Sequence, residues 1–167
     1  QAPVKALKAK AEFAGTKLEG QIELANDRKW EIADAALLLD ALVAELQAAD
    51  DIVIATPMYN FSVPAALKAW IDLICRDKIT FVYENDVSRG LLSNKQATVI
   101  ITSGGTVAGN YIDYATGYIL HILEFIGVKD VTIIDVTGLS KNRSKVIDDA
   151  RKQIAETSAK RLSGQRN

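Results

Sequence analysis

The sequence is poor in the residues that build disulfide frameworks and metal centres. Its 167 residues include one cysteine, Cys75, and one histidine, His121. A single cysteine cannot form an internal disulfide, and a single histidine cannot supply a histidine-rich metal site. We therefore expect no bound metal, a structural role for both side chains, and a cytoplasmic location.

The sequence also lacks an excess of charge of one sign and any long hydrophobic run. Twenty Lys and Arg residues stand against 21 Asp and Glu residues, which gives a formal net charge of −1. Without a basic excess, binding to nucleic acid or to an anionic membrane surface is not expected. No apolar run reaches the roughly 20 residues that cross a bilayer. The lysines in residues 1–10 are not followed by the apolar block of a signal peptide.

What remains is the composition of a globular domain, 49% hydrophobic and 25% charged. Three β-branched runs are typical of strands buried on both faces of a parallel sheet, namely 52–56, 97–102 and 131–136. Apolar residues at three- and four-residue steps predict helices over about 29–49, 64–76, 111–125 and 144–162. Since parallel strands need crossovers of this kind, the alternation predicts a three-layer, doubly wound α/β fold.

Candidate capping and turn-forming residues set the expected ends of the helices. Asn26 or Asp27 is expected to cap the first helix, and Asp50 and Asp51 to end it. Ser62 is a candidate cap before the helix that Pro64 begins, and Gly127 is expected to end the third helix. Residues 1–27 are the least readable part. A weak helical pattern runs from Ala6 to Phe13, and Gly15, Thr16 and Gly20 indicate turns.

Two loops leave the carboxyl ends of the predicted strands, where open parallel sheets bind their ligands. The first, residues 57–61, carries Met58, Tyr59 and Phe61 at a position that is usually polar, and Asn60 adds an amide. Such a loop suits a flat apolar ligand. The alternative is that these side chains fold back and extend the core.

The second loop, residues 103–106, contains Gly104 and Gly105. Without side chains, their backbone N–H groups can approach a ligand closely. The alternative is a plain turn that needs a positive φ. Together the two loops suit an isoalloxazine ring, which is planar and apolar with a polar edge of carbonyls and nitrogens.

The residues around these loops are familiar as a set. Residues 55–68, Ala-Thr-Pro-Met-Tyr-Asn-Phe-Ser-Val-Pro-Ala-Ala-Leu-Lys, resemble the signature of the FMN-dependent NADH-azoreductases, members of the flavodoxin-like quinone reductase superfamily. Residues 80–85, 90–92, 101–105 and 125–128 are similar to later segments of the same family. The resemblance extends over residues 28–163 of what we expect to be one flavodoxin-like domain over 1–167.

The resemblance implies a flavodoxin-like fold, non-covalent FMN, NADH or NADPH as electron donor, and a homodimer. It also implies ping-pong, two-electron reduction of quinones or azo compounds, in which the flavin carries the chemistry and no acid–base residue is required. The cofactor-binding residues that it implies are Pro57, Met58, Tyr59, Asn60, Phe61, Thr102, Ser103, Gly104 and Gly105. Tyr83 matches an aromatic residue that borders the substrate pocket.

One departure from the family lies at the start of the chain. The family begins with a strand, a serine-rich phosphate-binding loop and a helix, and no matching segment is visible here. The first strand of the family is the central strand of a 2-1-3-4-5 sheet. We therefore expect its absence to expose a sheet edge. Two other functions stay open at this point: a non-enzymatic FMN carrier, which the near-neutral charge disfavours, and a flavin-free interaction module.

Overall fold

The centre of the molecule is a parallel sheet whose three strands alternate with helices along the chain. In this computed structural model the described residues are 7–13, 16–22 and 39–163. The strands are β3 (Asp51–Pro57), β6 (Gln96–Thr102) and β7 (Asp130–Val136), in the order β3-β6-β7. Both pairings are parallel. The three predicted strands are thus confirmed, each within one residue at either end.

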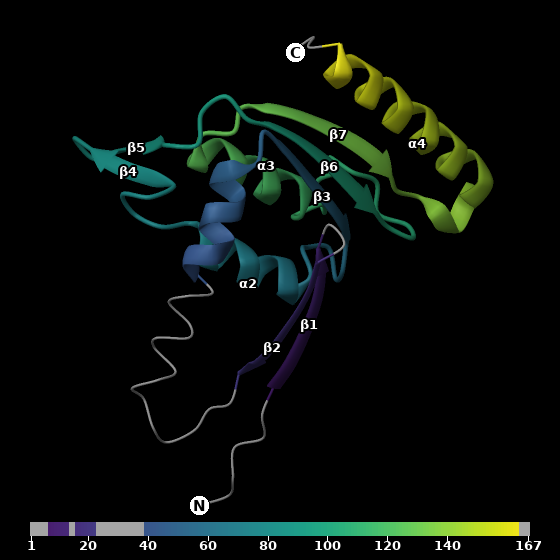
Figure 1. Cartoon of the computed structure of the whole chain (residues 1–167). Coiled ribbons are helices and arrows are strands. Elements are labelled where there is room, and N and C mark those ends of the chain that lie inside the picture. The colour runs from purple at the N-terminus through teal and green to yellow at the C-terminus, as the bar shows by residue number, and fades with distance from the viewer. Residues whose placement is uncertain (1–6, 14–15, 23–38, 164–167) are drawn as a thin grey trace, which may run out of the picture.

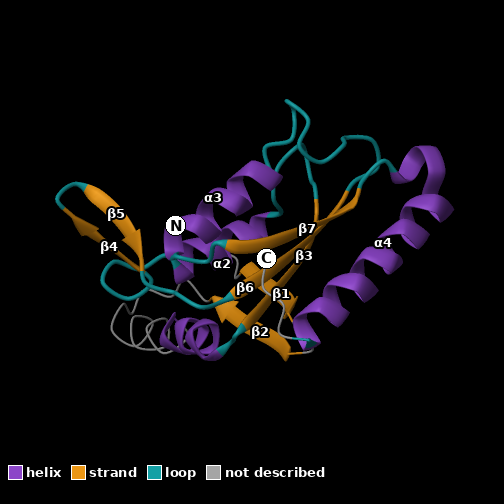
Figure 2. Cartoon of the chain, turned by 90° about the horizontal axis from the view of Figure 1, so that it is seen from above, coloured by secondary structure: helices purple, strands orange, loops and turns teal. Residues whose placement is uncertain are grey.

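Helices cover both faces of this sheet (Figures 1 and 2). One face packs against a helix over residues 39–48, α2 (Ala65–Ile74) and α3 (Thr116–Ile126). Its core contains alternate residues of β3 and β6 together with helical leucines and isoleucines: Leu42, Leu46, Ile52, Ile54, Ile74, Val99, Ile101, Ile119, Leu123 and Ile126. The other face packs Ile134 and Val136 against α4 (Leu139–Leu162). This three-layer arrangement is the doubly wound α/β architecture that the sequence predicts.

Two antiparallel hairpins add to the predicted elements. The first joins β1 (Leu7–Phe13) to β2 (Thr16–Ile22), so the weak helical pattern there was wrong. Gly20 lies inside β2, opposite Ala9, and not in a turn. The second hairpin joins β4 (Phe81–Glu84) to β5 (Val87–Gly90) and carries Tyr83. Gly15 lies outside the described residues, as do both proposed caps at 26–27 and the first part of the 29–49 helix.

Three predicted helix boundaries need correction. Asp51 is the first residue of β3 and not a helix end. Ser62 does not cap α2, because it pairs through its backbone with Tyr59, and Pro64 stands at the cap position. Residues 111–115 form a loop, and α3 begins only at Thr116, while Gly127 ends it with φ of 105° as expected. The predicted helix over 144–162 corresponds to α4 after its break at Asn142.

The edge of the sheet at β3 is open in the described part of the chain. There β3 pairs with β6 alone, and Val53 on the face that α4 covers is 51% exposed. At the start of the strand, Asp51 forms an ion pair with Arg161 near the end of α4. The expected exposed edge is therefore present among these residues. None of the helices described here is long and apolar enough to cross a membrane.

Thr80 ties the end of α2 to the β4–β5 hairpin. Its side chain is fully buried, and its Oγ1 donates to the carbonyl of Ile74 at 2.7 Å and accepts the N–H of Arg76 at 2.9 Å. The N–H of Leu91, just after β5, donates to the Thr80 carbonyl at 2.9 Å. One buried hydroxyl therefore satisfies backbone groups that α2 leaves unpaired at its end.

We expect Thr80→Val to lower the free energy of unfolding by about 1–3 kcal/mol, because the isosteric valine leaves these buried groups without a partner. Urea unfolding followed by circular dichroism measures the change. Thr80→Ser is the matched control, since it keeps the hydroxyl and removes one methyl group. Equal stabilities of Thr80→Val and the unchanged protein would show that the hydroxyl contributes nothing.

Candidate functional site

The register of the sheet places the two predicted loops side by side. Pro57, the last residue of β3, is paired with Thr102, the last residue of β6. The N–H of Met58 continues this ladder and donates to the carbonyl of Thr102 at 2.7 Å. Both loops therefore start from adjacent strands at the carboxyl edge, as the sequence predicts, and their first residues are held by a direct hydrogen bond.

The first loop is a tight turn that we name the aromatic turn, residues 59–62. The N–H of Tyr59 donates to the carbonyl of Ser62 at 2.9 Å, and the N–H of Ser62 donates back at 3.0 Å. Between them Asn60 and Phe61 have φ of 48° and 69°. Positive φ at both central positions is the pattern of a type I′ turn, which usually carries Asn followed by Gly.

Phenylalanine at the second central position is costly. A non-glycine residue in the left-handed region costs on the order of 1–3 kcal/mol and is concentrated at functional sites. Tyr59 and Phe61 are 61% and 50% exposed, so their rings are not held in place by burial in the core. Met58 differs, because its side chain packs against the core between the sheet, α2 and α3. For this one residue the alternative interpretation holds, in which the side chain folds back and extends the core.

The second loop, the glycine loop at residues 103–106, is anchored through its carbonyl groups. The N–H of Leu139 donates to Ser103 O at 3.2 Å, and the N–H and hydroxyl of Ser140 donate to Gly104 O at 2.9 and 2.6 Å. The buried Ser103 donates its hydroxyl to Thr106 O. The N–H groups of Gly104 and Gly105 donate to no acceptor among the described residues.

Nothing in the surrounding protein requires glycine in this loop. Neither Gly104 nor Gly105 has a positive φ, and a Cβ added at either position would meet no atom within 4 Å. A turn that needs a positive φ is therefore not the reason for these glycines. The open space beside both residues leaves room for a ligand to approach the bare backbone closely.

A third segment, the 107–115 loop, closes the same edge. Asp113 organises it: Oδ1 accepts the N–H groups of Ala115 and Thr116, each at 2.9 Å, and Oδ2 accepts the N–H of Gly109 at 2.8 Å and the Thr116 hydroxyl. Next to it, the N–H of Tyr114 donates to the carbonyl of Phe61 at 2.9 Å. Sequence reasoning placed Asp113 inside a helix, although an Asp just before a helical run is the usual sign of a cap.

These hydrogen bonds make the contribution of Asp113 to stability depend on pH. Its partial burial raises the pKa, but the bonds from Thr116, Gly109 and Ala115 outweigh this and hold the pKa below its ordinary value. A carboxylate with a lowered folded-state pKa stabilises the protein above its unfolded pKa of about 3.9, and this contribution is lost as the pH falls below that value.

We therefore expect the difference in unfolding free energy between the unchanged protein and Asp113→Asn to be constant above about pH 5 and to shrink as the pH falls below about 4. Urea denaturation at stepped pH values from 6 to 3 measures it. Asp77→Asn, at an exposed position just after α2, serves as a control for the loss of one charge. A difference that grew toward acid pH would contradict the assignment.

Tyr83 is the one predicted site residue that lies apart from the two loops. It lies on the β4–β5 hairpin, on the side of the sheet where β6 and β7 begin (Figure 1). Seven residues of β6 at about 3.3 Å each separate that end from the carboxyl edge by roughly 20 Å. Within one chain, Tyr83 and the aromatic turn therefore lie at opposite ends.

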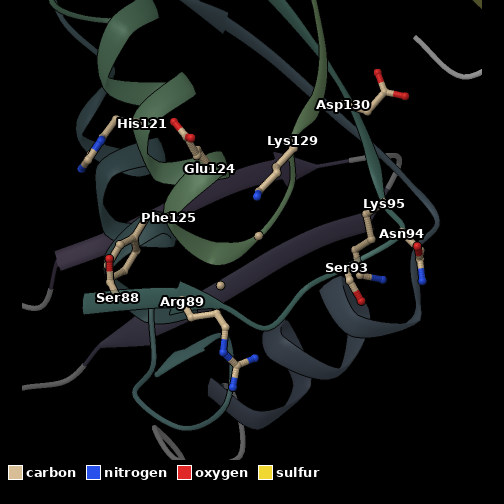
Figure 3. A pocket seen from close by; sticks show the side chains of 12 residues that line it. Ser88, Arg89, Ser93, Asn94, Lys95, His121, Glu124, Phe125, Lys129 and Asp130 are labelled. Carbon is tan, nitrogen blue, oxygen red and sulfur yellow. The ribbon is translucent and has the colours of Figure 1, made fainter. Parts of the chain in front are cut away.

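A cavity of about 720 Å³ lies at this amino end and is formed by β5, α3, the segment just before β6 and the start of β7 (Figure 3). Its charges are mixed, with Arg89, Lys95 and Lys129 beside Glu124 and Asp130. Arg89 is paired with Glu84, and Lys95 Nζ is bound to the carbonyls of Gln47 and Ala49 at 2.7 and 2.5 Å. The cavity therefore offers no concentrated charge to a ligand.

The two residues expected to be structural lie away from the carboxyl edge. Cys75 caps the end of α2, and burial raises the pKa of its thiol, which disfavours a nucleophilic thiolate. His121 is exposed on α3, where its ring stacks on Phe125 with centroids 6.5 Å apart. Among residues 39–163 and the first hairpin, no group of three His, Cys, Asp or Glu side chains is arranged to hold a metal ion.

Known proteins are similar to this chain in sequence and in fold. Residues 4–159 match the model of the family described as having a flavodoxin-like fold. The chain is 47% identical over 139 residues to FMN-dependent NADH:quinone oxidoreductase 1 of Jannaschia sp. (strain CCS1), covering 83% of this chain and 70% of that protein. It is 51% identical over 129 residues to the protein of the same name from Colwellia psychrerythraea, covering 77% and 67%.

A solved structure agrees with the fold. An FMN-dependent NADH-azoreductase from Bacillus anthracis, crystallised in complex with FMN, superposes with a TM-score of 0.74 at 25% identity, covering 79% of this chain and 65% of that one. The chain thus spans about two thirds of the length of the proteins it matches. The chain belongs to the flavodoxin-like fold family and, within it, to the group of the FMN-dependent NADH:quinone oxidoreductases.

Proposed function

We propose that this protein is an FMN-dependent NAD(P)H oxidoreductase that reduces quinones or azo compounds in two-electron steps by a ping-pong mechanism. The observation that carries the proposal is the pairing of two unexplained features at one edge of the sheet. Gly104 and Gly105 offer open backbone with no neighbouring atom at the Cβ position, and Phe61 has a costly left-handed conformation in the loop that leaves the adjacent strand.

These residues fit the ring system of FMN. The N–H groups of Gly104 and Gly105 face no acceptor among the described residues and can bind the polar edge of the ring. The exposed rings of Tyr59 and Phe61 offer apolar surface to its faces. Pro57, Met58, Asn60, Thr102 and Ser103 complete the proposed cofactor site through their positions in the two loops. When bound there, FMN would supply the two-electron hydride chemistry between the nicotinamide and the acceptor.

The chain's own contribution to the chemistry is electrostatic. Backbone N–H groups fixed in direction stabilise negative charge on a reduced ring without the cost of reorienting a solvent. The glycine loop is suited to this because its carbonyls are held by Leu139 and Ser140, which fixes its conformation. The amino end of α2 follows the aromatic turn and adds the positive end of a helix dipole.

We further propose that the active unit is a homodimer in which the second copy supplies Tyr83. This residue is 61% exposed on a hairpin at the opposite end of its own sheet from the two loops. It can border the substrate only from a neighbouring chain. The tip of the β4–β5 hairpin extends away from the body of the molecule, where a second copy can meet it (Figure 2).

Two measurements distinguish this proposal from its two alternatives, and a third tests the ping-pong mechanism. Titration with FMN tests whether the cofactor binds, and absence of binding would leave the flavin-free interaction module. NADH oxidation with a benzoquinone acceptor tests for turnover, and binding without turnover would indicate an FMN carrier. Parallel lines in double-reciprocal plots at several quinone concentrations are the expected ping-pong result, whereas intersecting lines would contradict it.

A further inference from the structure

We propose that Asp113 is a positioning residue for the flavin site, which it controls through the aromatic turn. The inference rests on the proposed function. Asp113 is not among the site residues that the sequence predicts. The inference starts from the 107–115 loop, which follows the glycine loop and is hydrogen-bonded to Thr137 and to Phe61 at the same edge of the sheet.

The loop is fixed at both ends. At its start, the N–H of Ala108 donates to Thr137 Oγ1 at 3.2 Å, and that hydroxyl donates to Asp135 Oδ1 at 2.6 Å at the end of β7. At its other end, the carboxylate of Asp113 accepts three N–H groups and one hydroxyl. A carboxylate that receives four donors is held in one orientation, because each rotation away breaks charge-assisted hydrogen bonds.

Because Asp113 holds the loop in place, it also positions the next residue, Tyr114. The N–H of Tyr114 lies between residues whose positions Asp113 sets, and it donates to the carbonyl of Phe61 at 2.9 Å. This is a hydrogen bond from outside the aromatic turn to the residue with φ of 69°. It opposes relaxation of Phe61 toward a commoner backbone conformation, which would redirect the aromatic side chain.

The alternative is that Asp113 is a helix cap and nothing more. In that case its loss would lower stability and leave the aromatic turn unchanged. The two roles can be separated by comparing Asp113→Asn with Thr80→Val. Thr80→Val is also expected to destabilise the protein, but it acts at the end of α2, outside the loops at the carboxyl edge.

The experiment measures three quantities at a temperature where every variant is folded. For Asp113→Asn we expect FMN to bind at least about tenfold more weakly, as loss of charge-assisted hydrogen bonds predicts. The visible absorption band of bound flavin is expected to shift because Phe61 no longer lies against the ring. The amide of Tyr114 is expected to exchange with D₂O at least about tenfold faster. Thr80→Val is expected to leave all three unchanged.

The possible outcomes separate the positioning role of Asp113 from a capping role alone and from failure of the proposed function. Destabilisation of Asp113→Asn with unchanged FMN affinity and Tyr114 exchange would overturn the proposal and leave a simple cap. If the unchanged protein binds no FMN, the proposed function fails, and the exchange rate of Tyr114 still tests the positioning role. If Asp113→Asn does not fold, Thr116→Val, which removes only the hydroxyl donor, is expected to shift the same quantities in the same direction by a smaller factor.

Discussion

Replacing Phe61 with glycine is expected to weaken FMN binding by about tenfold to a hundredfold and to leave the protein as stable as before or more stable. The lost aromatic contact with the ring accounts for the weaker binding. Glycine relieves a left-handed conformation that costs phenylalanine about 1–3 kcal/mol. It also turns the two central residues into Asn-Gly, the pair that type I′ turns favour.

Phe61→Ala is the matched control for this prediction. Alanine removes the same ring but still has a Cβ, so it keeps most of the strain at φ of 69°. We therefore expect both variants to bind FMN weakly, with Phe61→Gly the more stable by roughly 1 kcal/mol. Fluorescence titration and thermal unfolding measure the two effects. Wild-type FMN affinity in Phe61→Gly would show that the ring is not part of the site.

The largest loss of stability is expected from Gly90→Ala. A Cβ at Gly90 would lie 2.1 Å from the backbone N of Gly127 and 2.3 Å from the carbonyl carbon of Ile126. These are main-chain atoms at the end of α3, and they cannot turn aside as a side chain can. β5 would have to separate from α3, which also threatens the 2.9 Å hydrogen bond from Leu92 N–H to Ile126 O.

We expect Gly90→Ala to cost about 3 kcal/mol or more and to lower the midpoint of thermal unfolding by about 10 °C. Gly117→Ala is the control, because a Cβ there meets nothing within 4 Å. On an exposed position of α3, alanine is expected to raise stability by about 0.5–1 kcal/mol. A Gly90→Ala protein that unfolds at the wild-type temperature would show that the hairpin is not packed against α3 as described.

Much of the fold could be predicted because it depends on local patterns. The buried strands at 52–56, 97–102 and 131–136 contain few polar residues and therefore stand out in the sequence. Hairpins were harder to predict. The β4–β5 strands are only four residues each and largely exposed, so they carry no clear alternation. The start of α3 was placed too early because Tyr111, Ile112 and Tyr114 continue its apolar pattern, while the cap that stops the helix depends on side-chain geometry at Asp113.

The site was predictable as far as it depends on strand ends. Parallel register brings the residues after Thr56 and Thr102 together whatever the loops do afterwards. The sequence could not tell that Met58 packs inward while Tyr59 and Phe61 face outward, because all three are large and apolar. Nor could it tell that Tyr83 lies at the other end of the sheet, since that depends on how the hairpin packs against α3.

The central claim is that the aromatic turn and the glycine loop together bind the flavin ring. The most direct test follows backbone amide resonances by NMR during titration with FMN. We expect the amides of Asn60, Phe61, Gly104 and Gly105 to shift, and those of Arg89 and Lys129 at the amino-end cavity to stay in place. Shifts confined to the amino end of the sheet, or none at all at saturating FMN, would contradict the account.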